Sequence, residues 1–406
     1  MAKNAIVGQS GGPTAVINSS LAGVFEAAKN RGADTVYGMT HGVAGLLNND
    51  VVNLSKILDT SLEIELLKRT PSSFLGSCRY KLPNFEETTE PYEKIFKILK
   101  KLDIQFFFYI GGNDSMDTIM KLSDYAKEIG SNISFMGVPK TIDNDLMITD
   151  HTPGFGSAAK YIGATMKELI RDATVYGTPY VTVVEIMGRN AGWLTASASL
   201  AHSEDCEGVD MLCLPEIPFE IDIFLKRIEE LQKEKKSVVI AVSEGIKLND
   251  GRYVCELSDD ARFVDAFGHK NLTGTARYLS NQIAKNMNTK VRSIELSILQ
   301  RCAGHITSRT DITESYQVGG AAVRAAFNGY TGQMIALKRI SNDPYQCTTE
   351  AHDVHKIANL EKKVPLEWMC DDFTNVNEKF HRYARPLIQA ELTPIYINGL
   401  QRHIKL

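Results

Sequence analysis

The chain has 406 residues, 43% of them hydrophobic, which is enough to bury a sizeable core and favours two domains over one. Its formal net charge of −4 gives it no general attraction for nucleic acid, so an anionic ligand would have to be held by local basic residues. No run of eighteen apolar residues and no signal peptide is recognisable, which predicts a cytoplasmic protein without a membrane partner. Seven cysteines without a CxxC pair indicate reduced thiols rather than a zinc site or a disulfide framework.

The N-terminal stretch predicts a strand, a glycine pair and a helix. Residues 4–7 are expected to form the first strand, and apolar side chains from Val16 to Ala28 recur at helical spacing. Gly11 and Gly12 lie between the two elements. Main-chain N–H groups and the helix dipole can receive a phosphate in such an arrangement. Two adjacent glycines are weak evidence, however, and an ordinary βα turn explains them equally well.

Two further stretches carry polar residues that suit a phosphate site. Residues 66–85 predict an irregular loop that contains Arg79, although solvated surface charge is the commoner role of such an arginine. Residues 104–110 predict a strongly apolar strand, which runs into Gly-Gly-Asn-Asp-Ser and then a helix over about 116–129. This second phosphate cradle contains Asp114, whose alternative role is to cap the helix N-terminus.

The loop 139–145 combines the residue types that phosphoryl transfer needs. It follows a short apolar strand over 133–138 and contains Lys140, Asp143 and Asp145. One carboxylate could take a proton while the other faces a metal ion, and a lysine and a metal together can neutralise a transferring phosphoryl group. An ordinary turn rich in Asp and Asn is the structural alternative.

The second half of the chain continues the alternation of strands and helices. Strands are expected over 181–186, 211–214 and 238–242, and helices over about 193–201 and 221–234. Near-continuous apolar strands that alternate with helices predict parallel sheets covered on both faces.

The C-terminal part is less regular. Arg292 precedes a strand-like stretch that is expected to end at Gln300 and Arg301. Beyond about Ser341 prolines interrupt the pattern, so we expect an appendage packed on the second domain.

Six motifs at predicted strand ends then fall in one order along about the first 330 residues. They read SGGPTAVIN, GGNDS, PKTIDND, MGRNAGW, SEG and the pair Gln300-Arg301. This set resembles the phosphofructokinase family, whose members phosphorylate fructose 6-phosphate at the 1-hydroxyl. The resemblance implies an α/β fold of two Rossmann-like three-layer domains, with mostly parallel sheets, that face each other across a cleft. Residues 1–153 with about 303–340 would bind the phosphoryl donor, and 154–302 with 341–406 would form the sugar-phosphate domain and its appendage.

The resemblance also implies a role for each matching residue. Asp143 would take the proton of the sugar hydroxyl, and Asp145 would orient it and contact Mg²⁺. Gly12 and Arg79 would lie on the donor side. The sugar phosphate would be bound by Thr141, Ile142, Met187, Gly188, Arg189, Glu244, Arg292 and Arg301. Arg292 would reach in from a neighbouring subunit, so the implied assembly is a homodimer or homotetramer with shared active sites.

The expected donor is pyrophosphate. ATP-dependent members usually read GGDGS and PGTIDND, where this chain has Asp114 and Lys140. Asp114 puts a carboxylate where the nucleotide α-phosphate would lie, and like charges in a water-poor cleft repel. Lys140 places a cation where a pyrophosphate leaving group would develop charge. Both residues match the pyrophosphate-dependent branch of the family, as does GGPTAVIN in place of GGDAPGMN.

Two residues depart from the family pattern. Asn113 stands at the usual metal-binding aspartate and is a weaker ligand for Mg²⁺. Tyr180 stands where many members carry a second phosphate-binding arginine. The alternatives are an ATP-dependent phosphofructokinase and a non-catalytic regulatory subunit, although the latter would not need both Asp143 and Asp145. A dehydrogenase fits less well, because no GxGxxG pattern with a following acidic residue is present.

Overall fold

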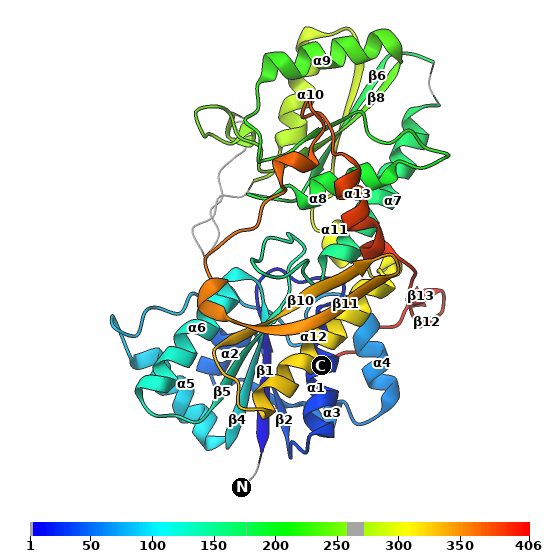
Figure 1. The fold of residues 1–406 in the computed structure, drawn as a ribbon. Coiled ribbons are helices and arrows are strands. Elements are labelled where there is room, and N and C mark those ends of the chain that lie inside the picture. Colours follow the sequence, from blue (N-terminus) through cyan, green and yellow to red (C-terminus); the bar gives the residue numbers. More distant parts are fainter. Residues whose placement is uncertain (1–2, 176, 258–271) are drawn as a thin grey trace.

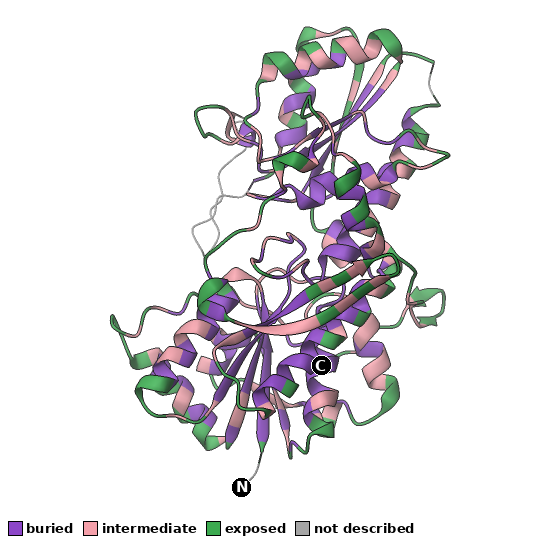
Figure 2. Cartoon of the chain, in the orientation of Figure 1, coloured by how far each residue is buried: buried purple, intermediate pink, exposed green. Residues whose placement is uncertain are grey.

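The computed structural model describes residues 3–175, 177–257 and 272–406, which form two main sheets with helices on both faces of each (Figure 1). Buried residues run along the strands of both sheets and along the helix faces that cover them (Figure 2). In the part of the chain that is described, no helix combines the length and the apolar character needed to cross a bilayer.

The larger sheet has the strand order β11-β10-β5-β4-β1-β2-β3. Its inner strands are parallel, and β3 and β11 join its two edges antiparallel. The strands are β1 (Asn4–Gln9), β2 (Val36–Met39), β3 (Val51–Asn53), β4 (Ile104–Gly111), β5 (Ser134–Pro139), β10 (Gln333–Asn342) and β11 (Tyr345–Asp353).

Alternation along β4 gives the larger sheet its two hydrophobic faces. Phe108 and Ile110 belong to the core under one set of helices, and Phe107 and Tyr109 belong to the core under the other set. The first set is α1 (Ile17–Asn30), α3 (Leu54–Ile57), α4 (Ser61–Arg69) and α12 (Arg309–Phe327). The second set is α2 (Gly42–Leu47), α5 (Glu90–Lys101) and α6 (Asn113–Glu128).

The smaller sheet is parallel throughout, with the order β7-β8-β6-β9. Its strands are β6 (Tyr180–Ile186), β7 (Met211–Cys213), β8 (Ser237–Ser243) and β9 (Lys290–Glu295). The helices around it are α7 (Phe155–Ala173), α8 (Trp193–Ala196), α9 (Ile221–Glu234), α10 (Thr275–Asn286) and α13 (Glu378–Ala384). Its central strands are apolar on both sides because helices cover both faces.

Residues 341–353 were expected to belong to an appendage on the second domain, but they lie in the larger sheet. They complete β10 and form β11, which pairs antiparallel with β10 from Gln333–Asp353 to Asn342–Tyr345 in the larger sheet. Pro344 lies in the short turn between the two strands, so it does not interrupt either of them. The chain then crosses to the smaller sheet (Figure 1), where α13 buries Phe380 and Tyr383 against its core. The last strands, β12 (Tyr396–Ile397) and β13 (Leu400–Gln401), form a separate small hairpin.

The prediction of a strand that ends at Gln300 and Arg301 is also wrong. Arg292 lies inside β9, which ends at Glu295, and Ser297 then takes a left-handed backbone conformation with φ 44°. Gln300 and Arg301 lie on the short helix α11 (Leu299–Cys302) that follows. The strand pattern therefore breaks at Ser297, because a positive φ is incompatible with a continuing strand.

Candidate active site

Loops at the carboxyl ends of β1, β4, β5, β6 and β8 converge on one cavity of about 620 Å³. Such loops are where ligands bind in open α/β sheets, and here they come from both sheets. The predicted residues that line the cavity are Gly12, Arg79, Asn113, Asp114, Lys140, Thr141, Ile142, Asp143, Asp145, Met187, Arg189, Glu244 and Arg301. Gly188 and Arg292 are not among the residues that line it.

The loop after β5 is held by a buried asparagine between the two aspartates. Asn144 is fully buried, with a positive φ of 55° that a short polar side chain tolerates. Its Nδ2 donates to the Tyr383 hydroxyl at 2.7 Å, and its Oδ1 accepts from the main-chain N–H of Thr152 at 3.0 Å. Because Asn144 points into the protein, Asp143 and Asp145 on either side of it reach the cavity.

Asp143 is oriented by Thr141. The Thr141 hydroxyl donates to Asp143 Oδ2 at 3.2 Å and accepts from the Asp143 main-chain N–H at 3.1 Å. Burial raises the pKa of Asp143, although the Thr141 hydrogen bond and the cation of Lys140 oppose this effect. Burial and the neighbouring carboxylate of Asp143 also raise the pKa of Asp145. The pair can therefore hold or release a proton closer to neutral pH than an exposed aspartate.

Lys140 is a buried cation between the loops that follow β1 and β5. Its side chain is 3% exposed, and its Nζ donates to the main-chain carbonyl of Gly12 at 2.7 Å. Burial lowers the pKa of Lys140 to about 8, opposed by Asp143 and Asp145. Gly11 has a φ of 76°, and a Cβ added there would lie 3.2 Å from Lys140 Nζ, so a glycine suits both its backbone and the space.

The N-terminus of α6 forms another part of the wall. Gly112 is its N-cap, and Asp114 lies exposed in the first turn, so Asp114 is not the cap that was its alternative role. Asn113 donates through Nδ2 to the carbonyl of Leu360 at 2.8 Å, while its Oδ1 is buried with no hydrogen-bond partner among the described residues. An amide oxygen without a partner in a polar cavity suits a cation or a water molecule.

The loops after β6 and β8 meet on the opposite side. Gly188 has a φ of 141° and is buried, and its N–H donates to Glu244 Oε1 at 3.3 Å. Burial raises the pKa of Glu244 to about 8, despite that hydrogen bond. The Met187 N–H donates to the side chain of Gln300 at 3.3 Å, which ties this loop to the short helix that carries Arg301.

Arg292 is exposed on the edge strand β9 and does not line this chain's cavity. Its guanidinium lies 5.9 Å from the centre of the Tyr180 ring, a cation–π contact on the outside of the smaller sheet. A role for Arg292 in the site therefore requires a second chain.

Several cavity residues were not among the predicted site residues. Asn190 and the segment Asn359–Glu361 also line the cavity. The amide of Asn190 donates to Glu361 Oε1 at 2.9 Å, so the loop after β6 and the C-terminal part of the chain meet here. Asn190 lies inside a motif that the sequence did identify, whereas Asn359–Glu361 lies in the stretch expected to be irregular.

The residues present fit a divalent cation that also binds a phosphorylated ligand. Asp145 and Asn113 offer oxygen atoms to the same cavity, and Mg²⁺ prefers oxygen ligands. Among the described residues no three His, Cys, Asp or Glu side chains form a complete metal site. In proteins Mg²⁺ commonly binds one or two protein oxygens together with water and substrate phosphates.

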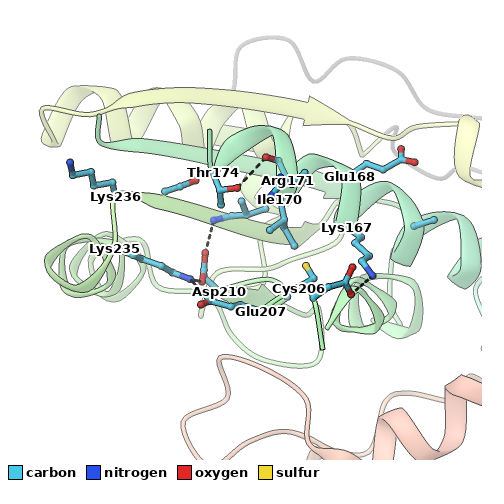
Figure 3. A pocket seen from close by; sticks show the side chains of 15 residues that line it. Lys167, Glu168, Ile170, Arg171, Thr174, Cys206, Glu207, Asp210, Lys235 and Lys236 are labelled. Atoms are coloured by element: carbon cyan, nitrogen blue, oxygen red, sulfur yellow. Dashed lines mark hydrogen bonds and ion pairs between the residues drawn. The ribbon is translucent and has the colours of Figure 1, made fainter. Parts of the chain in front are cut away.

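A second cavity, of about 1080 Å³, lies on the smaller sheet and contains none of the predicted residues (Figure 3). Several of its charged side chains pair with one another: Lys167 with Asp205 at 2.7 Å, and Lys235 with Asp210. Asp210 also accepts from the main-chain N–H of Val239 at 2.7 Å. Because these charged side chains bind one another and the main chain, we attribute them to local structure and not to a ligand site.

Residues 4–326 match the phosphofructokinase family. The pyrophosphate–fructose 6-phosphate 1-phosphotransferase of Halomonas elongata is 40% identical over 99% of this chain and 96% of its own length. The enzyme of the same name from Methylococcus capsulatus is 39% identical over 100% and 96%. The crystal structure of the pyrophosphate-dependent phosphofructokinase from Nitrosospira multiformis superposes with a TM-score of 0.90 at 36% identity, covering 100% of this chain and 96% of that one. The predicted fold class is therefore confirmed.

Proposed function

Because the chain belongs to the phosphofructokinase family, we propose that its cavity transfers a phosphoryl group from pyrophosphate to the 1-hydroxyl of fructose 6-phosphate. The products are fructose 1,6-bisphosphate and phosphate. The resemblance indicated by the six sequence motifs is confirmed by the match over residues 4–326.

The observation that carries the choice of donor is the buried ammonium of Lys140. At neutral pH a group with a pKa of about 8 is mostly charged, and it stands in the same cavity as Asp143 and Asp145. Charge builds on the leaving phosphate as the bridging P–O bond breaks, and a fixed cation in a water-poor site stabilises that charge. Asp114, exposed at the first turn of α6, repels a donor that carries further phosphates.

Asp143 is proposed as the general base. The sugar 1-oxygen forms the new bond to phosphorus, its proton passes to the Asp143 carboxylate, and the bridging P–O bond to the leaving phosphate breaks. Thr141 supports this role because its hydroxyl fixes one carboxylate oxygen at 3.2 Å. Asp145 would orient Asp143.

Asp145 would also hold Mg²⁺, together with Asn113 Oδ1. When bound, the cation would neutralise negative charge on the pyrophosphate oxygens. Asn113 contributes an uncharged oxygen, so more of the binding would rest on Asp145 and on pyrophosphate itself.

The sugar phosphate would lie against the smaller sheet. Thr141, Ile142, Met187, Gly188, Arg189 and Glu244 are proposed to bind the sugar, and Arg301 the 6-phosphate through its bidentate fork. Arg292 of a neighbouring subunit would complete that phosphate site. Gly12 and Arg79 would contact the donor, so the larger sheet with its helices would form the donor domain. Assembly into homodimers or homotetramers and a cytoplasmic location belong to the same proposal.

One assay tests the proposal. Purified protein is incubated with fructose 6-phosphate and Mg²⁺, with pyrophosphate or ATP as the sole donor. We expect pyrophosphate to be used at least about a hundredfold better, which is a discrimination of only about 3 kcal/mol. Preference for ATP would contradict the roles given to Lys140 and Asp114, and inactivity with both donors would favour a non-catalytic subunit.

A further inference from the structure

A segment of the C-terminal part crosses the cavity between the two sheets. We call Asn359–Lys362 the strap. It lies outside residues 4–326, the part of the chain that matches the family. Three of its residues, Asn359, Leu360 and Glu361, line the cavity, so it is part of the site and not only a connection between domains.

On the donor side the strap is fixed to the first turns of α6. Asn113 Nδ2 donates to the main-chain carbonyl of Leu360 at 2.8 Å. The side chain of Asn359 donates to Asp117 Oδ1, one turn further along the helix, at 3.1 Å. The strap therefore covers the helix end whose main-chain N–H groups suit a phosphate.

On the other side the strap is fixed to the segments that follow β5 and β6. Asn190 donates to Glu361 Oε1 at 2.9 Å, and the main-chain N–H of Lys362 donates to the carbonyl of Asp145 at 2.7 Å. The indole N–H of Trp193 donates to the carbonyl of Lys362 at 2.9 Å. Contacts on both sides hold the strap in place, so it acts as a wall of defined position.

The position of this wall limits the donor. A donor that reaches from Lys140 to the first turn of α6 has the strap at its far end, where the half-exposed side chain of Leu360 faces the cavity. Asp114 in the first turn of α6 and Glu361, which accepts from Asn190 on the opposite side, both line the cavity and repel additional phosphate charge. Space is also short, because a single ligand commonly occupies a pocket of about 300–1,000 Å³. Here about 620 Å³ must hold both substrates.

We propose that the strap is a specificity element that limits the phosphoryl donor to two phosphate units, with Leu360 as the residue that ends the donor site. The inference rests on the proposed function, because it concerns the donor of that reaction. The sequence motifs attribute the selection of the donor to Asp114 and Lys140 alone. The inference attributes a part of this selection to the strap.

The test compares two inorganic donors of different length. The specificity constants kcat/KM for pyrophosphate and for tripolyphosphate are measured with saturating fructose 6-phosphate and Mg²⁺, and their ratio is the readout. The variants are Leu360→Ala, which shortens the wall but keeps the main-chain bond from Asn113, and Asn359→Ala, which removes the bond to Asp117. Leu366→Ala is the matched control, since Leu366 is 53% exposed in the same C-terminal part and does not line the cavity.

We expect wild type to prefer pyrophosphate by at least about tenfold, and Leu360→Ala and Asn359→Ala to raise the relative use of tripolyphosphate at least about tenfold. Leu366→Ala should leave the ratio unchanged, and a purely structural role of the strap would lower both constants together. Equal use of both donors by wild type, or an unchanged ratio in both strap variants, would overturn the inference while leaving the proposed function intact. Wild type that uses only ATP would instead overturn the proposed function, and the strap inference with it.

Discussion

The ammonium nitrogen of Lys140 lies 2.7 Å from the main-chain carbonyl oxygen of Gly12, so the loops after β1 and β5 meet at one buried cation. A second carbonyl, that of Gly111, accepts from the Lys140 main-chain N–H at 2.9 Å and brings in the loop after β4. Lys140, one of the two residues by which this chain departs from the ATP-dependent pattern, is therefore fixed where β4 and the loops after β1 and β5 meet.

The first prediction concerns this departure. Asp114→Gly should let the protein use ATP, weakly at first, because Lys140 still occupies space that a γ-phosphate needs. Adding Lys140→Gly should reduce pyrophosphate use more than ATP use, because the charge on the leaving phosphate loses its cation. Steady-state kinetics with each donor measures both effects.

A matched control is Asp103→Gly. Asp103 is an exposed aspartate outside the cavity, and its φ of 51° suits glycine, so the variant has the same change of charge without strain. It should leave the donor preference unchanged. A similar gain of ATP use in Asp103→Gly would attribute the effect to overall charge and not to Asp114.

The second prediction concerns pH. Burial, opposed by Asp143 and Asp145, lowers the pKa of Lys140 to about 8, so its cation is present below that pH and lost above it. Activity should therefore fall as the pH rises through about 8. On the acid side it should fall when Asp143 is protonated, and burial moves this step above the usual range of an aspartate.

The variant Lys140→Arg distinguishes the titration of Lys140 from the titration of pyrophosphate. Pyrophosphate titrates alike with both proteins, whereas a guanidinium stays charged across the whole range. We expect the variant to be slower at neutral pH but to lose the decline near pH 8. If the decline persists unchanged, Lys140 is not the group whose charge the reaction needs.

The third prediction concerns the base. Asp143→Asn keeps the size and hydrogen bonding of the side chain but cannot accept a proton. Its kcat should fall by about 10²–10⁴ while sugar-phosphate binding, measured by calorimetry, changes little. Asp145→Asn should in addition raise the Mg²⁺ concentration needed for half-maximal activity. Near-normal turnover in Asp143→Asn would assign the chemistry to another residue.

Much of the fold follows from local pattern. The sequence pattern predicted the helix over 221–234, which is α9. The apolar run 104–110 predicted a strand, and it lies in β4. β11 could not be predicted in the same way, because it is a half-exposed strand at the edge of the sheet, paired with β10. The antiparallel pairing of such a strand depends on tertiary context more than on its own composition.

Parts of the site that depend on the chemistry of side chains could be predicted from the sequence, and parts held by main-chain atoms could not. Asp143, Lys140 and Glu244 are residue types with an evident chemical role, and the structure places all three at the cavity. The strap is held largely by main-chain atoms, such as the carbonyl of Leu360 and the N–H of Lys362. Every residue carries these atoms, so no residue type marks them in a sequence.

The fourth prediction concerns stability. His151, 1% exposed, follows the loop 139–145 and contacts Asp150 at 2.8 Å and Glu314 at 2.7 Å. Burial opposes its protonation, but these carboxylates prevail and raise the pKa of His151 from 6.5 to about 9. Its stabilising charge is therefore fully present below pH 6.5 and lost as the pH rises through about 9. The loss should be on the order of 3 kcal/mol of unfolding free energy.

Urea unfolding at pH 6.5 and pH 9 measures this effect. The difference between wild type and His151→Gln should shrink at the higher pH, where the folded wild type is losing the cation. His355→Gln is the control, because His355 is exposed and pairs with Asp353 and Asp124 at the surface, where ion pairs contribute little. An equal difference at both pH values for His151→Gln would contradict the prediction.

The last prediction is that active sites are shared between subunits through Arg292. Arg292 is exposed on the edge strand β9, outside its own chain's cavity, whereas Arg301 lies inside it. A sugar phosphate dianion needs converging basic side chains, and the family resemblance implies a further arginine where this chain has Tyr180. Arg292→Ala and Asp143→Ala should each be nearly inactive as pure oligomers, which enzyme assays of the purified variants will show.

Co-expression of the two variants distinguishes a shared site from an unshared one. In a mixed dimer, one site combines the intact Asp143 of one chain with the intact Arg292 of its neighbour, and the other site lacks both. Half of randomly formed dimers are mixed and half of their sites are whole, so activity should recover to about a quarter of wild type. Arg301→Ala with Asp143→Ala is the matched control, because both residues serve their own chain's cavity and no mixed site is whole. If verified mixed oligomers of Arg292→Ala and Asp143→Ala recover no more activity than this control, Arg292 does not reach a neighbouring site.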